Sequence, residues 1–238
     1  MTSNLLLKKY ASTFNKYKNT RVNCSSDKSE DKLIERGLEF QFDEGAKNLD
    51  VLFVGINPSY NGIKSEAKHY TKQQSLNHHY FKSFVNIEKS LINDYSRSIS
   101  WSHIDLLVFR ETKQSFIKDR LLKHDDGVEF IWQQLQVSKS YLEWLNPKVL
   151  VIANSLARTF FGADKKVVKG KVKDEWLGYD FIFDKTSGTR KIANNPGFEP
   201  YVFFTSMLSG QRALDNGSKE RLVWHIDRIL KKTGGNNS

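Results

Sequence analysis

The sequence has little cysteine, little proline and no long apolar run, and each scarcity excludes a class of protein. Cys24 is the only cysteine among 238 residues, so the chain forms no internal disulfide, no cysteine-based zinc site and no cysteine-ligated iron–sulfur cluster. No stretch approaches the ~20 apolar residues of a membrane span. The first ten residues, MTSNLLLKKY, hold too few apolar residues for a signal peptide. We therefore expect a soluble, cytoplasmic protein.

Positive charge, by contrast, is abundant. The chain has 37 Lys and Arg against 27 Asp and Glu, a formal net charge of +10. Such an excess favours a polyanionic partner, although a merely solubilising surface is the alternative. The length suits one large domain, which would bury roughly 70–75% of the surface of its extended chain.

Apolar runs alternate with helical patterns along most of the chain. The runs are bounded by turn residues, as in strands that are buried on both faces, and the helical patterns place apolar residues on one side. Strands that alternate with helices predict an α/β domain built on a parallel sheet. The expected strands are residues 50–55, 104–108, 148–153 and 200–205, and the expected helices are residues 80–95, 128–145, 155–161 and 218–230.

The α/β domain is expected to comprise residues 48–232, and three segments fall outside its alternation of strands and helices. Residues 1–47 are expected to form a polar N-terminal extension, residues 163–199 an insertion or a hairpin within the domain, and residues 233–238 a tail. The insertion includes the lysine-rich stretch 165–173. The elements expected here are helices at 5–17 and 31–37, short strands at 178–184 and 189–193, and a disordered tail at 233–238.

The loops that follow the predicted strands carry polar side chains. Sites in parallel α/β sheets lie at the carboxyl ends of the strands, which selects Asn57, Ser59, Arg110, Asn154, Ser206, Ser209 and Arg212. These are amides, hydroxyls and guanidinium groups. The sequence has no Ser–His–Asp or Cys–His arrangement, no GxxxxGK[ST] loop and no GxGxxG. The loops therefore predict a polar cleft that suits an anion.

Two of these loops carry a family resemblance. Residues 51–60, VLFVGINPSY, resemble the first motif of the uracil-DNA glycosylase superfamily, and most of all its mismatch-specific uracil/thymine branch, whose loop reads GINPG. Residues 204–212, FTSMLSGQR, resemble the second motif, His/Asn-Pro-Ser-x-Leu-Ser followed by Arg, at its Ser, Leu, Ser and Arg positions. Order and spacing agree over roughly residues 48–232. The resemblance implies a three-layer α/β/α sandwich around a central, mainly parallel four-stranded sheet.

The resemblance also implies an activity. It predicts a monofunctional DNA glycosylase of base excision repair, which flips uracil or a related deaminated base out of DNA and hydrolyses its N-glycosidic bond. Asn57 would be catalytic and orient a water toward the sugar C1′. Because an amide is a poor base, positioning and electrostatic stabilisation would supply most of the rate. Backbone N–H groups around Ile56 would receive charge from the departing base. The alternative is that Asn57-Pro58-Ser59 only starts a turn.

Two further residues are predicted to bind the flipped base. Tyr70 lies close to where the family positions a stacking aromatic, although Tyr80 and Phe81 compete for this role and Phe81 suits a helix core. Asn154 directly follows the third predicted strand, where uracil-specific members carry a base-reading asparagine. Its amide would donate to uracil O4 and accept from N3–H. The alternative for Asn154 is a helix N-cap.

The second motif supplies the predicted DNA contacts. Leu208 resembles the exposed wedge that fills the gap left by the flipped nucleotide. The predicted phosphate-binding residues are Ser59, Ser206, Ser209 and Arg212. The motif departs from the family at its start, where Phe204 stands in place of His or Asn and removes one side-chain hydrogen bond. A catalytically weak DNA-binding protein is therefore an open alternative.

The remaining expectations concern cofactors and partners. We expect no cofactor and no metal, because no carboxylate joins the histidines at a ligand spacing. We expect DNA as the partner, no membrane association and a monomer, associated with the nucleoid if the source is bacterial. A hydrolase of free nucleosides or nucleotides is a further alternative, and it would act on small substrates without depending on duplex length.

Overall fold

The structure is a computed structural model that describes residues 1–26, 29–209 and 213–234. Contacts divide the chain into two compact units. Unit 1 comprises Met1–Glu44, Ile56–Thr71 and Asp105–Trp144, and unit 2 comprises Gly45–Gly55, Lys72–Ile104 and Leu145–Ser238. The division of the chain into an extension, a domain and a tail stays a prediction, and residues 235–238 of that tail lie outside the described residues.

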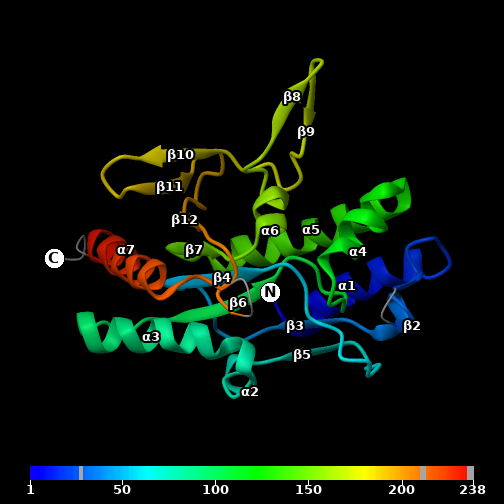
Figure 1. The fold of residues 1–238 in the computed structure, drawn as a ribbon, viewed down its shortest axis with the longest axis horizontal. Helices are drawn as coiled ribbons and strands as arrows, with labels where there is room; N and C mark the ends of the chain where they lie inside the picture. The colour runs from blue at the N-terminus through cyan, green and yellow to red at the C-terminus, as the bar shows by residue number, and fades with distance from the viewer. Residues whose placement is uncertain (27–28, 210–212, 235–238) are drawn as a thin grey trace. The chain divides into compact units, whose positions relative to one another are not determined.

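Unit 2 is built on a six-stranded sheet with the order β10-β11-β12-β7-β4-β6 (Figure 1). Strand β7 runs parallel to both β4 and β12, whereas β11 runs antiparallel to β12 and to β10. The strands are β4 (Val51–Gly55), β6 (Trp101–Asp105), β7 (Val149–Ile152), β10 (Phe181–Asp184), β11 (Thr189–Ile192) and β12 (Tyr201–Phe204). The predicted α/β class with a mostly parallel sheet is confirmed. The four-stranded arrangement is wrong, because the segment predicted as a hairpin adds two antiparallel strands at one edge.

The central strands are apolar on both faces. Every residue of β4 and β7 is buried, which is typical of strands covered on both sides. The register aligns Phe53 of β4 and Phe203 of β12 with Val151 of β7. Since side chains alternate along a strand, these three share one face of the sheet.

Helices cover both faces of this sheet. On the face of Phe53, helices α3 (Lys82–Tyr95) and α7 (Asn216–Gly234) pack side by side. Phe53 stacks on Phe84 of α3 at 4.6 Å, and Phe203 stacks on His225 of α7 at 5.6 Å. On the other face, α6 (Ser155–Phe160) brings the Arg158 guanidinium to 5.6 Å from the ring of Phe204. The short helices α2 (Lys72–Ser75) and η2 (His79–Phe81) precede α3.

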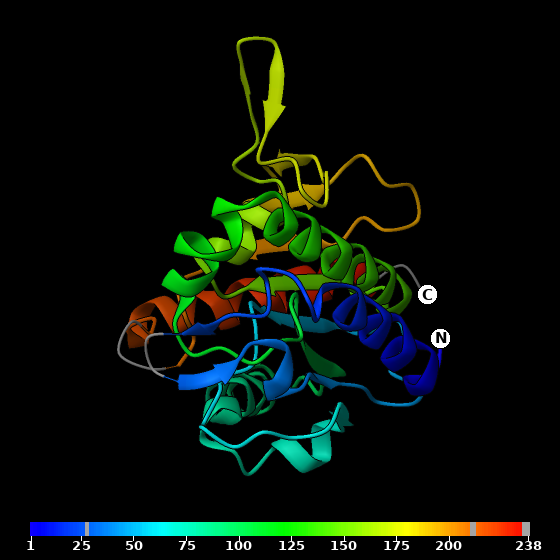
Figure 2. The same cartoon turned by 90° about the vertical axis from the view of Figure 1, so that its right-hand side faces the viewer.

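A two-stranded hairpin also belongs to unit 2. Strands β8 (Lys166–Val168) and β9 (Lys171–Lys173) pair with each other in antiparallel register. Both views show the hairpin projecting from unit 2, away from its six-stranded sheet (Figure 1 and Figure 2).

Unit 1 consists of helices and two small sheets. Helix α1 packs on α5, with Phe14 and Tyr17 at 5.6 and 5.4 Å from Phe130, and the Tyr10 hydroxyl lies 2.7 Å from that of Ser138 in the interior. Strands β3 and β5 pair in parallel, and β1 and β2 in antiparallel, register. The elements are α1 (Ser3–Tyr17), β1 (Ser25–Ser26), β2 (Ser29–Lys32), η1 (Ile34–Arg36), β3 (Glu39–Gln41), β5 (Lys68–Tyr70), α4 (Gln114–Asp119), η3 (Leu121–Lys123) and α5 (Asp125–Leu145).

Two predicted elements differ from the structure. The helix predicted over residues 31–37 is confirmed only as the short 3-10 helix η1, because residues 31 and 32 belong to β2. The strand predicted at 104–108 is β6, which starts at Trp101, because the polar residues Ser102 and His103 are buried within it. Among the residues that the structure describes, no helix is long and apolar enough to cross a membrane.

Candidate functional site

The loop that follows β4 belongs to unit 1 and runs along residues 107–112. The Ile56 carbonyl accepts a hydrogen bond from the Leu107 N–H at 2.9 Å, and the Pro58 carbonyl accepts one from the Glu111 N–H at 2.9 Å. The Thr112 hydroxyl donates to the Tyr60 carbonyl at 2.7 Å. These bonds hold the backbone of residues 56–60 at three points, so the loop has a defined shape.

Asn57 is held in this loop by its amide nitrogen. Its Nδ2 donates to the carbonyls of Pro58, at 2.9 Å, and of Glu111, at 2.5 Å. Within the described residues, its Oδ1 accepts no hydrogen bond, and the side chain is partly exposed. The two carbonyls therefore fix the orientation of the amide and leave its oxygen available to a water molecule or ligand.

A buried ion pair supports the carbonyl that holds Asn57. The Arg36 side chain is completely buried, and its guanidinium donates to Glu111 Oε2 at 2.6 Å. The same guanidinium donates to the Asp31 carbonyl at 2.9 and 3.1 Å. The other carboxylate oxygen of Glu111 accepts from the Lys113 N–H at 2.9 Å. Both ends of the ion pair are thus tied to backbone, as buried charges require.

Arg110 is buried as well, which corrects the expectation that it contributes its charge to a polar cleft that suits an anion. It is 5% exposed. Its guanidinium donates to the Ile63 carbonyl at 2.8 Å and to the Ser65 hydroxyl at 3.0 Å, and its Nε lies 3.5 Å from Glu39 Oε2. The side chain is occupied in holding the 61–65 segment, so it does not offer its charge at the surface.

Tyr60 completes this group of residues. Its hydroxyl donates to Asp31 Oδ2 at 2.5 Å, and its ring lies 4.9 Å from the Arg36 guanidinium and 5.3 Å from that of Arg110. Burial and the hydrogen bond to Asp31 raise the pKa of the Tyr60 hydroxyl. We call Asp31, Arg36, Glu39, Tyr60, Arg110 and Glu111 the arginine cluster. The sequence analysis missed its role, because nothing near Arg36 in the sequence signals a partner.

Three further predicted site residues lie in unit 1. Ser59 is exposed on the same loop as Asn57. Tyr70 ends strand β5, pairs with Gln41 of β3 and is partly exposed. Ile56 is 5% exposed, so only its backbone suits the predicted role. Ile56, Asn57 and Ser59 therefore share one loop, and the stacking role of Tyr70 stays a prediction.

Asn154 caps helix α6 in unit 2. Its Oδ1 accepts hydrogen bonds from the Leu156 and Ala157 N–H groups at 2.8 and 3.3 Å, and the residue is 5% exposed. The capping alternative is confirmed. In the part of the chain that the structure describes, Nδ2 makes no hydrogen bond. It can therefore donate to a ligand, whereas acceptance from uracil N3–H would compete with the cap.

The second motif differs most from expectation. Leu208 is 2% exposed, so the prediction of an exposed wedge is wrong. The neighbouring Met207 forms a bridge with Ala213, and its carbonyl accepts a hydrogen bond from the Leu214 N–H at 2.9 Å. Ser206 is exposed and Ser209 partly exposed, as phosphate contacts would need. Arg212 lies outside the described residues.

The aromatic alternatives to Tyr70 lie in unit 2. Phe81 is 5% exposed and packs edge-to-face on Phe84 at 5.6 Å and on His103 at 5.3 Å. Its interpretation as a core residue is confirmed. The Tyr80 ring lies 5.4 Å from Phe84 and remains partly exposed, so Tyr80 stays an alternative for stacking.

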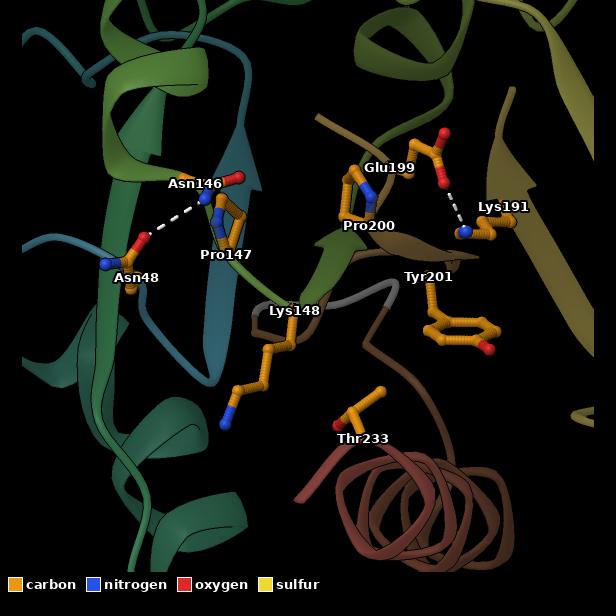
Figure 3. Close-up of a pocket in the computed structure, with 9 residues that line it drawn as sticks. All are labelled: Asn48, Asn146, Pro147, Lys148, Lys191, Glu199, Pro200, Tyr201 and Thr233. Carbon is orange, nitrogen blue, oxygen red and sulfur yellow. Dashed lines mark hydrogen bonds and ion pairs between the residues drawn. The ribbon is translucent and has the colours of Figure 1, made fainter. Parts of the chain in front are cut away.

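A pocket of about 410 Å³ lies at the opposite ends of the unit 2 strands (Figure 3). It is found where β7 and β12 begin, and the sequence analysis, which considered only the carboxyl ends, did not predict it. Lys148 is paired with Asp50 at 2.9 Å, and Lys191 is paired with Glu199. Burial tends to raise the pKa of Asp50, but hydrogen bonds from Lys148 and Ser100 lower it below its ordinary value. The pocket thus offers little free charge. The residues that line it are Asn48, Asn146, Pro147, Lys148, Lys191, Glu199, Pro200, Tyr201 and Thr233.

Comparison with known proteins adds no family assignment. No protein-family model matches the chain, and no curated protein matches it. The resemblance to the uracil-DNA glycosylases therefore depends on residues 51–60 and 204–212. Over the described ranges, no group of three or more His, Cys, Asp or Glu is arranged to hold a metal ion.

Proposed function

We propose that this protein is a DNA glycosylase that excises uracil or a related deaminated base from DNA. The observation that carries the proposal is the orientation of Asn57. Its amide nitrogen donates hydrogen bonds to two backbone carbonyls, and its oxygen is available to a ligand. Asn57 is itself part of the loop that reads GINPSY. An amide oxygen held in this way can orient a water molecule, which is the role that the family resemblance assigns to this position.

The reaction that follows is a largely dissociative hydrolysis. The bond between C1′ and the base nitrogen breaks, and its electron pair stays on the base, which takes up a proton from solvent. The water held by Asn57 Oδ1 bonds to C1′ and releases a proton. Because an amide does not act as a base at neutral pH, Asn57 contributes position, and backbone N–H groups near Ile56 stabilise the charge on the leaving base.

The arginine cluster supports this role by fixing the partner of Asn57. The Glu111 carbonyl accepts from Asn57, while the Glu111 carboxylate is bound by the fully buried Arg36. Movement of Glu111 would therefore break a buried ion pair as well as a hydrogen bond. A catalytic amide benefits from such support, since small displacements of a positioning group lower rates strongly.

Asn154, in unit 2, keeps a hydrogen-bond donor of the kind that the family resemblance assigns to base recognition. Its Oδ1 caps α6, which leaves Nδ2 to donate to a carbonyl such as uracil O4. Cytosine presents an amino group at that position, and a donor facing a donor is unfavourable. A single donated hydrogen bond would favour uracil over cytosine without reading the rest of the base.

The experiment that tests the proposal is a base-release assay with a chelator present. Oligonucleotides that contain uracil, a thymine mismatch, hypoxanthine or xanthine are each incubated with the parent and with Asn57→Ala. We expect release of at least one base, and a rate lower by roughly 10²- to 10³-fold in Asn57→Ala. Asn86→Ala, at an exposed position on α3, is the matched control and should keep the parent rate. Equal rates for the parent and Asn57→Ala would contradict the role of Asn57.

A second candidate function is DNA binding with weak or no catalysis. The observation that favours it is Phe204, whose ring packs on Phe181 at 5.2 Å and under the Arg158 guanidinium. This residue offers no hydrogen bond where active relatives carry His or Asn. Under this alternative, all four oligonucleotides bind with strong salt dependence and no abasic product forms.

A further inference from the structure

The β8–β9 hairpin of unit 2 is a short ribbon with a tight turn. Lys169 and Gly170 form the turn, with positive φ values of 51° and 75°, as in the two-residue type I′ turns that match the twist of a hairpin. Figure 1 and Figure 2 both show the ribbon standing away from the rest of unit 2.

The two faces of the ribbon differ in chemistry. Residues that lie directly opposite each other share a face, and the register pairs Lys166 with Lys173 and Val168 with Lys171. The other face carries Val167 opposite Val172. Val167 is 71% exposed and Val172 is 52% exposed. One face therefore presents three lysines, and the other presents an exposed apolar pair.

This arrangement is unfavourable for the isolated chain. Like charges directly opposite each other destabilise a strand pair, and a two-stranded hairpin is at best marginally stable on its own. In the described part of the chain, no ion pair involves Lys166, Lys171 or Lys173. At the base of the hairpin the situation is reversed, because Lys165 pairs with Asp180 there. Within this segment, Lys165 at the base is therefore paired, whereas Lys166, Lys171 and Lys173 of the projecting part have no ion pair among the described residues.

The base of the ribbon is fixed to unit 2. Gly162 has φ +88°, and a Cβ at this position would lie 2.8 Å from the Glu175 carbonyl oxygen. Trp176 packs on Phe160 of α6 at 4.8 Å, and the Leu177 N–H donates to the Phe160 carbonyl at 3.0 Å. The ribbon is therefore a projection with an anchored base.

We propose that the β8–β9 hairpin is an arm that binds in the major groove of duplex DNA. The major groove of B-DNA admits a two-stranded ribbon. Lys166, Lys171 and Lys173 would contact the phosphates, which are the complementary charge, and the valine pair would contact the groove interior, where thymine presents a methyl group. The proposal extends the proposed function, since it names duplex DNA as the partner, but it requires no catalysis.

The first test measures affinity for a duplex that contains no uracil, over a range of salt concentrations. Lys166→Gln/Lys171→Gln/Lys173→Gln should bind roughly 10- to 100-fold more weakly at low salt. The negative slope of log K against log salt should become shallower by about 2 to 3, which is near 0.9 for each phosphate that is no longer neutralised. The control Lys82→Gln/Lys89→Gln/Lys185→Gln removes three exposed lysines that make no ion pair in the described residues, and it should bind like the parent. An equal decrease in affinity in the hairpin variant and in the control would contradict the proposed arm, because only a general effect of net charge would then explain binding.

The second test separates duplex DNA from other polyanions. Val167→Ser/Val172→Ser should weaken binding to duplex DNA several-fold without changing the salt slope. Duplex RNA, whose major groove is too narrow for side chains to read, should bind the parent and the lysine variant alike. The major-groove proposal would be wrong if the lysine substitutions weakened binding to duplex RNA as much as binding to duplex DNA. It would also be wrong if the parent bound vesicles containing phosphatidylserine more tightly than DNA.

These outcomes are separable from those for the proposed glycosylase activity. The affinity measurements use DNA without a damaged base, so they report on the arm even if no base is ever released. If the protein releases uracil and all hairpin variants bind DNA with the affinity of the parent, the proposed function is supported and the proposal of a DNA-binding arm is wrong.

Discussion

The arginine cluster of unit 1 and the β8–β9 hairpin of unit 2 both contain cationic side chains, but in opposite surroundings. Arg36 and Arg110 are buried and paired with Glu111 and Glu39. The hairpin lysines are exposed, and two of them lie directly opposite each other. Buried, paired cations hold a loop in place, whereas exposed cations without partners remain available to a ligand.

The difference shows how a net charge of +10 should be interpreted. From sequence, the excess predicted a polyanion, and Arg110 and the lysine-rich stretch 165–173 were both expected to contribute to the polar cleft. In the structure Arg110 holds backbone and side chains of the 61–65 segment. The charge that is free to act is therefore better sought where cations lack partners than where they are close to a motif.

The largest predicted effect comes from breaking the buried pair. Arg36→Met should lower the free energy of unfolding by about 3–5 kcal/mol, because it leaves the Glu111 carboxylate buried without its partner. Urea unfolding of the variant and the parent measures this difference. Arg36→Met/Glu111→Gln, which removes both charges, should recover part of the stability. A decrease below about 1 kcal/mol in Arg36→Met would mean that the pair behaves like an exposed one.

A smaller effect is predicted from pH. Burial, with a further contribution from the Glu39 carboxylate, raises the pKa of Asp105 to about 8 from its usual 3.8. Between these values the folded protein binds a proton that the unfolded chain has released, so stability falls as pH rises from about 4 to 8. The slope is at most about 1.4 kcal/mol per pH unit, and partial exposure reduces it. Asp105→Asn should flatten the dependence of the unfolding free energy on pH, and an unchanged slope would contradict this assignment.

The smallest predicted effect is a gain in stability at the hairpin. Lys173→Thr removes the like charge opposite Lys166 and introduces a residue that favours strands. We expect the free energy of unfolding to rise by about 0.2–1 kcal/mol, and affinity for duplex DNA to fall. Thermal unfolding and DNA titration of this variant measure the two changes. A fall in stability would show that the lysine pair is not strained.

Sequence patterns predicted the regular part of the fold well. Apolar runs located β4, β7 and β12 closely, because strands buried on both faces have continuous apolar sequences. Strand β6 was displaced because Ser102 and His103 are buried despite their polarity. The hairpin at β10 and β11 was expected, but its pairing with β12 depends on contacts between distant strands that periodicity does not encode.

The candidate site was less predictable for a similar reason. Asn57 was selected from its loop and from the family resemblance, and both alternatives for Asn154 were stated, of which the helix cap is observed. Arg36 could not be selected, because its partner Glu111 lies 75 residues away in the sequence. Leu208 was expected to be exposed, and its observed burial is not encoded in the short motif that surrounds it in the sequence.

The measurement that tests the account most directly is single-turnover release of uracil at saturating DNA. The account predicts that the parent releases uracil with EDTA present and that Asn57→Ala is slower by roughly 10²-fold or more at unchanged affinity. The hairpin variant Lys166→Gln/Lys171→Gln/Lys173→Gln should bind DNA more weakly, so more DNA is needed to saturate it. At saturation it should release uracil at the parent rate. Release by Asn57→Ala at the parent rate, or no release by the parent from any damaged oligonucleotide, would contradict the account.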